Sequence, residues 1–164
     1  MRHGAAFMLV LLAAGCGAGS SPAVSDSRQV DMCTILPDAE LSQLGIRPST
    51  RTPVDRAGSV GCEWTAASFT VSLERDSQPL ASYRARPRPA FINYTDNMVN
   101  GRRGARFKVD RGGTDCEQLM DGGPVSLVVS VAPAVTGNAR PVDSCAEALR
   151  IAESIEPRLP KPGG

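Results

Sequence analysis

The feature that most constrains how this 164-residue chain folds is a set of cysteines spread along its body. They are Cys33, Cys62, Cys116 and Cys145. An even number of cysteines is typical of two disulfides in a small exported domain. No two of them stand as a C-x₂-C pair, which a four-cysteine zinc site needs. We therefore expect a disulfide-bonded scaffold with no metal and no other cofactor.

Sequence spacing favours one disulfide pairing over its nested alternative. Two successive cysteine pairs each span 29 residues, and each would join the start of a helix to a neighbouring strand. The favoured pairs are Cys33–Cys62 and Cys116–Cys145, and the nested alternative is Cys33–Cys145 with Cys62–Cys116. By the chain-entropy argument each favoured bond contributes about 3–4 kcal/mol. That argument does not choose between the pairings.

The N-terminus has the pattern of a lipoprotein signal peptide. Arg2 and His3 precede an apolar run over residues 5–14, which is about half of the roughly 20 residues that a membrane-spanning helix needs. Small residues then lead into Cys16, as in the lipobox that a signal peptidase cleaves. We expect Cys16 to become the lipidated N-terminus, carrying diacylglycerol and a further acyl chain such as palmitate. An ordinary secretory signal that contains a cysteine is the alternative.

This interpretation divides the chain and narrows its chemistry. We expect a signal peptide over 1–15, a flexible Gly/Ser-rich tether over 16–30, one domain over 31–160 and a disordered tail over 161–164. Cleavage would remove the only histidine, so a triad, a Cys-His dyad or a His-ligated metal is excluded from the mature protein. The 18 basic residues balance 17 acidic ones, which argues against a nucleic-acid partner.

Residue periodicity predicts an α+β domain. Residues 61–65 and 69–75 alternate apolar and polar positions around a tight turn, and three further strands are expected at 105–109, 116–120 and 125–131. Residues 47–60 are interpreted as a loop, and 76–104 as irregular except for a short helix near residue 80. Ser144 and Glu147 form a capping box for a C-terminal helix. The expected fold is an antiparallel β-sheet meander packed by a short N-terminal helix and a longer C-terminal helix, stapled by two disulfides.

Short motifs then follow one another in a recognisable order. They are Asp31 and Cys33 before a short helix, Cys62 and Trp64 in a strand, Cys116 in a later strand, and Asp143 and Cys145 at the start of the last helix. Over about residues 31–160 this order resembles the actinobacterial lipoproteins grouped as a domain of unknown function, DUF3558. The resemblance implies an envelope location and a scaffold with two disulfides. It implies no reaction.

Some side chains are candidates for chemistry, each beside a simpler interpretation. Four acids that would suit acid/base work on glycans are Glu63, Asp115, Glu117 and Asp121. Their alternative role is as solvated strand and turn residues. Trp64 is a candidate stacking platform for a ligand, although its place beside Cys62 favours core packing. No loop has the ligand spacing of an EF-hand.

Arginine clusters are the remaining candidates. They are Arg84, Arg86 and Arg88, followed by Arg102, Arg103 and Arg106. Anionic lipid head groups or acidic wall polymers are the ligands that such clusters would attract. We expect Arg102, Arg103 and Arg106 to make any such contact. The composition of a GC-rich genome explains many of these arginines as plain surface residues.

Two classes of function follow. The favoured one is a non-catalytic binding or interaction module, anchored through acylated Cys16 to the outer face of the cell membrane. Its partner would be an envelope protein, a lipid or a wall polymer. The alternative is a small cell-wall glycan hydrolase that uses carboxylates alone.

Overall fold

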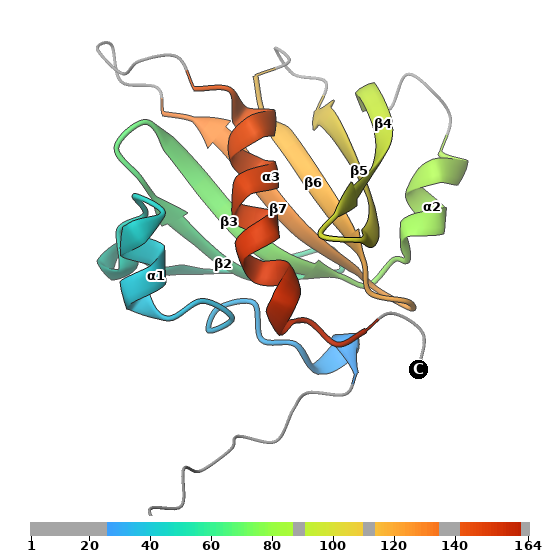
Figure 1. The fold of residues 1–164 in the computed structure, drawn as a ribbon, viewed down its shortest axis with the longest axis horizontal. Helices are drawn as coiled ribbons and strands as arrows, with labels where there is room; N and C mark the ends of the chain where they lie inside the picture. The colour runs from blue at the N-terminus through green and yellow to red at the C-terminus, as the bar shows by residue number, and fades with distance from the viewer. Residues whose placement is uncertain (1–25, 87–90, 110–113, 135–141, 162–164) are drawn as a thin grey trace, which may run out of the picture.

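One antiparallel sheet dominates the protein (Figure 1). The computed structural model describes residues 26–86, 91–109, 114–134 and 142–161. Within these ranges seven strands pair in the order β1-β2-β3-β7-β6-β5-β4. The strands are β1 Thr52–Arg56, β2 Ser59–Thr65, β3 Phe69–Asp76, β4 Phe91–Val99, β5 Arg102–Val109, β6 Cys116–Asp121 and β7 Ser126–Pro133. The helices are α1 Asp38–Gln43, α2 Leu80–Ala85 and α3 Ser144–Ile155, with 3₁₀ turns at Ser27–Gln29, Pro48–Thr50 and Glu156–Arg158. The predicted α+β class is confirmed.

The chain builds this sheet as two meanders. The first runs β1-β2-β3 and the second runs β4-β5-β6-β7, and antiparallel pairing of β3 with β7 joins them. In that central pairing Ser72 lies opposite Ser130, and Ser130 lies opposite Glu117 of β6. A row of polar residues therefore crosses the middle of the sheet.

One face of the sheet is covered by α3, which runs across β6 and β7 (Figure 1). We call it the helix-covered face. Alternate strand residues turn apolar side chains towards the helix, as the period of a strand requires. Packed together there, and each at most 1% exposed, are Trp64, Val71, Leu73, Leu127, Val129 and Val131 with Ala148, Ile151, Ala152 and Ile155 of the helix. This face contains the main core.

Both disulfides lie on the helix-covered face. Cys33 bonds Cys62 of β2, and Cys116 of β6 bonds Cys145 in the first turn of α3. The favoured pairing is confirmed, and the nested one is wrong.

The Asp-x-Cys motifs have a local function as caps. The Asp31 carboxylate accepts a hydrogen bond from the backbone N–H of Cys33 at 2.9 Å. Asp143 accepts from the N–H groups of Cys145 and Ala146, both at 3.1 Å. Asp143 is therefore the N-cap of α3, and the predicted capping box at Ser144 and Glu147 is wrong by one position.

Two segments that were expected to be irregular form the edges of the sheet. The expected loop over 47–60 contains β1, in which Pro53 lies. The stretch 76–104 contains β4, whose register shifts between Ile92 and Thr95 around Asn93 with φ 54°. Such a bulge breaks the two-residue period and hides the strand from sequence analysis.

The ends of the chain differ in what can be described. The expected tether overlaps the folded domain over residues 26–30, because Asp26 caps a 3₁₀ turn and Val30 is 3% exposed in the core. The predicted signal peptide, Cys16 and most of the tail lie outside the described residues. Among the described helices, none is both long and apolar enough to cross a membrane.

Candidate functional site: an acidic cavity on the open face of the sheet

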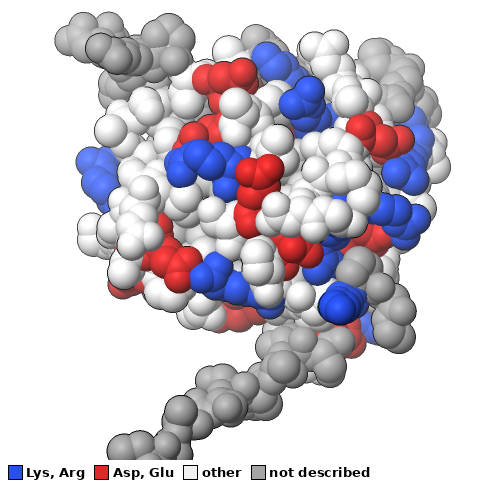
Figure 2. All heavy atoms as spheres, viewed as in Figure 1, with Lys and Arg blue, Asp and Glu red and all other residues white. Residues whose placement is uncertain are grey.

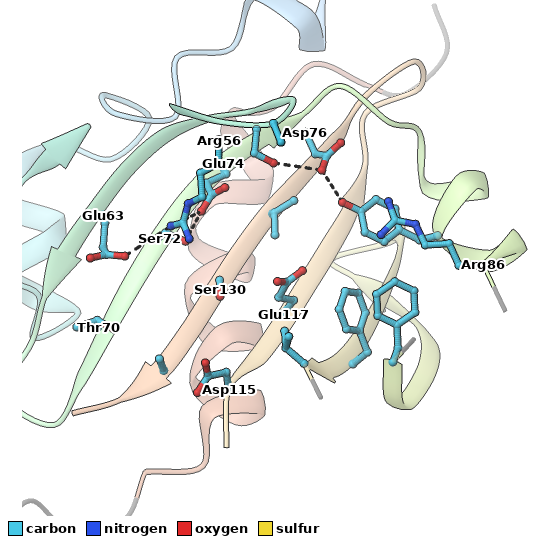
Figure 3. Close-up of a pocket in the computed structure, with 18 residues that line it drawn as sticks. Arg56, Glu63, Thr70, Ser72, Glu74, Asp76, Arg86, Asp115, Glu117 and Ser130 are labelled. Atoms are coloured by element: carbon cyan, nitrogen blue, oxygen red, sulfur yellow. Dashed lines mark hydrogen bonds and ion pairs between the residues drawn. The ribbon is translucent and has the colours of Figure 1, made fainter. Parts of the chain in front are cut away.

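The face opposite α3 carries a cavity of about 500 Å³ (Figure 3). We call it the acidic cavity. Its floor is made by the outward positions of β3, β6 and β7, which alternate with the core positions described above. Thr70, Ser72 and Glu74 come from β3, Ser130 from β7, and Glu117 from β6. The same alternation that builds the core thus places polar groups on the other side.

At the β1 end of the cavity the acids are paired with a cation. Arg56 lies 3.3 Å from the Glu74 carboxylate and 3.7 Å from that of Glu63 (Figure 3). Glu74 is 8% exposed and also accepts a hydrogen bond of 2.6 Å from the Ser72 hydroxyl. These contacts supply hydrogen-bond and ion-pair partners to a carboxylate that is largely removed from water.

Asp76 at the end of β3 joins the floor to α2. Its carboxylate accepts from the Tyr83 hydroxyl at 2.7 Å and from the Ser59 hydroxyl at 3.1 Å (Figure 3). Burial, followed by the nearby Asp76 carboxylate, raises the pKa of Tyr83 above its ordinary value. Tyr83 therefore stays a neutral hydrogen-bond donor to Asp76.

Aromatic rings close the other end of the cavity. The ring centroids of Phe91 and Phe107 are 4.1 Å apart, and each lies 6.0 Å from the centroid of Tyr83. The Arg86 guanidinium sits over two of these rings, 4.4 Å from the centroid of Tyr83 and 5.5 Å from that of Phe91. This small second core, which α2 covers, gives the cavity an apolar wall beside its charged floor.

Glu117 lies between the polar floor and the aromatic wall. It is opposite Ser130 of β7 on one side and opposite Phe107 of β5 on the other. Asp115, which lies directly before β6 and two positions before Glu117, lines the same cavity. No described side chain donates a hydrogen bond to the Glu117 carboxyl or forms an ion pair with it, and Figure 3 draws no dashed line to it.

The environment of Glu117 changes its acidity. Burial is the largest cause, the Glu74 and Asp76 carboxylates add to it, and together they raise the pKa of Glu117 to about 7. Arg56 and Arg86 act in the opposite direction without cancelling the shift. Near neutral pH Glu117 therefore exists in both protonation states, and a neighbouring positive charge would ionise it.

Three of the four acids singled out in the sequence lie together in this cavity. They are Glu63, Asp115 and Glu117. Asp121 lies elsewhere, 4% exposed, where it accepts from Arg103 at 2.6 Å. Trp64 is 1% exposed in the core, so the core interpretation of this residue is confirmed.

The candidate anion contacts occupy different environments. Arg102 has a side chain that is 2% exposed and donates to Glu156 and to the carbonyls of Asp121 and Pro160. Burial removes it from the surface, so the anion-contact prediction now rests on Arg103 and Arg106, both exposed. Arg88 lies outside the described residues. Figure 2 shows basic and acidic side chains interspersed on the face that carries α3.

Part of the cavity lining carries no signal in the sequence. Arg56, Asp76 and Phe91 come from β1, the end of β3 and the start of β4. Nothing local marks them, because long-range strand pairing brings them together. In the described part of the chain, no group of three or more His, Cys, Asp or Glu side chains could hold a metal ion.

Comparison with known proteins gives a family and nothing finer. No curated protein and no solved structure matches the chain. Residues 11–158 match the family described as a protein of unknown function, DUF3558, and this match includes nearly all of the described fold. The chain therefore belongs to the DUF3558 family, as the order of its Asp-x-Cys and Cys-x-Trp motifs indicates.

Proposed function

We propose that this protein is a non-catalytic binding module of the cell envelope, with the acidic cavity as its ligand site. The observation that carries the proposal is the cavity itself. Pockets that bind small molecules commonly measure about 300–1,000 Å³ and combine apolar walls with a few polar groups. This cavity of about 500 Å³ has an aromatic wall, and its carboxylates lie outside the main hydrophobic core, on the opposite face of the sheet.

An envelope location is part of the same proposal. It is supported by the lipobox-like sequence that ends in Cys16 and by two disulfides, which persist in oxidising compartments. In this proposal acylated Cys16 holds the domain at the outer face of the membrane. Cys16→Ala should yield an unprocessed precursor or a soluble product without lipid. A Cys16→Ala protein that partitions into detergent like the wild type would refute the anchor.

Blocking the cavity tests the binding function directly. The purified protein is titrated with solubilised lipids, wall glycans and small envelope metabolites, and amide shifts are recorded by NMR. Ala132→Phe would fill the cavity, whereas Ala146→Phe places the same ring on the exposed side of α3. We expect a ligand that shifts cavity residues in the wild type and in Ala146→Phe and does not do so in Ala132→Phe. Equal binding by both variants would move the site elsewhere.

A glycan hydrolase is the second candidate, and one observation favours it. Glu117, with a pKa of about 7, shares the cavity with Asp115, and glycosidases pair a protonated carboxylic acid with a second carboxylate. The test is release of reducing ends from purified wall glycan by wild type and by Glu117→Gln. Turnover that is lost in Glu117→Gln while the fold is retained would replace the binding proposal with the hydrolase.

A further inference from the structure

We infer that the ligand of the acidic cavity is an organic cation with an apolar body, such as an alkyl or aryl ammonium. Its charge would lie against Asp115 and Glu117, and its apolar part against Phe91 and Phe107. This inference rests on the proposed function, because it assumes that the cavity is a ligand site. It adds the chemical class of the ligand.

The charges of the cavity are the first argument. Among the described residues, five carboxyl side chains and two guanidinium groups line it. Arg56 is engaged by Glu63 and Glu74, and Arg86 by the rings and by Gln78 at 2.9 Å. The acids that no guanidinium pairs are therefore Asp76, whose carboxylate already accepts from the Tyr83 and Ser59 hydroxyls, and Asp115 and Glu117. An ammonium group would supply the missing positive charge and form charge-assisted hydrogen bonds there.

The aromatic wall is the second argument, and it is independent of the acids. Rings of Tyr and Phe attract cations through the negative potential of their faces. Arg86 already uses this property, with its guanidinium 4.4 Å from the centroid of Tyr83. The neighbouring ring of Phe107 lies directly opposite Glu117 across the β5–β6 pair. An ammonium carried by an apolar body would thus contact a carboxylate and a ring together.

A bare metal ion fits this arrangement less well. The described residues contain no cluster of three or more potential metal ligands, and much of the wall consists of the side chains of Phe91, Phe107, Val109 and Val128. Hard metal ions prefer several oxygen ligands at short range. The cavity instead places the carboxyls of Asp115 and Glu117 beside an apolar wall.

Binding of a cation should depend on pH because a proton competes for Glu117. The charged and titratable groups around Glu117 are Glu74 and Asp76 of β3, Arg56 of β1, Tyr83 of α2, Arg86 after α2, and Asp115 directly before β6. Below pH 7 Glu117 is largely neutral in the free protein, and a bound ammonium would have to displace that proton. Affinity should therefore rise between pH 5 and pH 8.

The test compares a cation with its neutral analogue. The full, disulfide-bonded protein is titrated with 2-phenylethylamine and with 2-phenylethanol at pH 8, followed by amide shifts. We expect the amine to bind at least about tenfold more tightly than the alcohol at pH 8. We also expect the affinity for the amine to be at least about tenfold lower at pH 5 than at pH 8. Equal affinities for amine and alcohol would overturn the inference.

Matched variants assign the effect to the two carboxyls. Glu117→Gln and Asp115→Asn should each weaken amine binding by about tenfold, and Glu117→Gln should also flatten its pH dependence. Glu153→Gln removes an exposed acid on α3, outside the cavity, and should change neither. Melting temperatures confirm that each variant is folded. Unchanged amine binding in both cavity variants would overturn the inference.

Failure of this inference can be told apart from failure of the proposed function. A glycan or lipid that binds in the cavity and is blocked by Ala132→Phe, with the amine silent, would overturn the cationic ligand and leave the binding module standing. Silence of the amine and of every envelope fraction would overturn both.

Discussion

The two faces of the sheet carry the same strands but do different work. On the helix-covered face the residues are apolar, sealed under α3 and joined to it and to the N-terminal segment by both disulfides. On the open face the intervening residues include acids and serines, which line a cavity together with Arg56, Arg86 and an aromatic wall. Because side chains alternate along a strand, one face can be fixed by stability while the other varies with its ligand. In this fold, therefore, consecutive residues of one strand contribute in turn to the stabilising core and to the candidate site.

The largest test removes the covalent part of the helix-covered face. By the chain-entropy argument, loss of either disulfide should destabilise the protein by about 3–4 kcal/mol. Loss of both should consume much of the roughly 5–15 kcal/mol by which a domain is stable. We expect a marked fall in melting temperature when the protein is reduced, measured by circular dichroism. An unchanged melting temperature would mean that packing under α3 alone holds this face.

Two residues of β7, one on each face of the sheet, allow the comparison to be made within a single strand. Leu127 is fully buried on the helix-covered face, and Ser130 lines the acidic cavity. Leu127→Ala should cost about 2–5 kcal/mol of unfolding free energy because it leaves a void in the core. Ser130→Ala should change it by about 0.5 kcal/mol or less. Urea denaturation of both variants gives the values, and similar costs would show that the two faces are not energetically distinct.

Acidity offers a test confined to the open face. With its pKa at about 7, Glu117 destabilises the fold once it is ionised, because the unfolded carboxyl ionises near its model value of 4.5. This penalty is absent at low pH, grows as pH rises from 4.5 towards 7, and is complete above 7. Glu117→Gln should remove it, making the variant more stable than wild type at pH 8 by on the order of 2–3 kcal/mol.

The control for this measurement is low pH. At pH 4.5 the variant Glu117→Gln should have almost the same free energy of unfolding as the wild type. Glu117 is then protonated in the folded wild type, so its burial costs little free energy. Denaturation at both pH values, on wild type and variant, provides the comparison. An advantage of equal size at both would trace the effect to packing and not to charge.

The smallest expected effect concerns the cation on the aromatic wall. Arg86→Ala removes a guanidinium that lies over Tyr83 and Phe91, and it should destabilise the protein by about 0.5–1 kcal/mol. It should also raise the pKa of Glu117 further, since Arg86 lowers it in the wild type. Carbon NMR of the Glu117 carboxyl reports the shift. Arg106→Ala, an exposed arginine outside this cavity, is the matched control and should change neither quantity.

How far the sequence predicts this molecule depends on which face is considered. Regular alternation in 61–65 and 69–75, the cysteine spacing and the periodic C-terminal segment predict most of the helix-covered face. β4 escapes because its bulge at Asn93 interrupts the alternation, and β1 because Pro53 is typical of loops. The local rules thus succeed where burial repeats regularly and fail at the edges.

Of the cavity, the sequence predicts only some of the acidic residues as candidates. Glu63, Asp115 and Glu117 are recognisable as candidate carboxylates, but their meeting depends on β3 pairing with β7, which no local pattern announces. Arg56 and Arg86 reach the same cavity from opposite ends of the sheet. Their effect on Glu117 follows from that distant assembly and not from neighbours in sequence.

The two edge strands of the sheet affect whether separate molecules of this protein can pair with one another. An open antiparallel sheet ends in two strands whose free backbone groups are templates for pairing with another chain. Here β1 carries Pro53, which has no N–H to offer, and β4 is kinked at Asn93. Neither edge presents a long, flat row of donors and acceptors. Edge-to-edge contact between neighbouring molecules is therefore not expected to lead to intermolecular strand pairing and fibril growth.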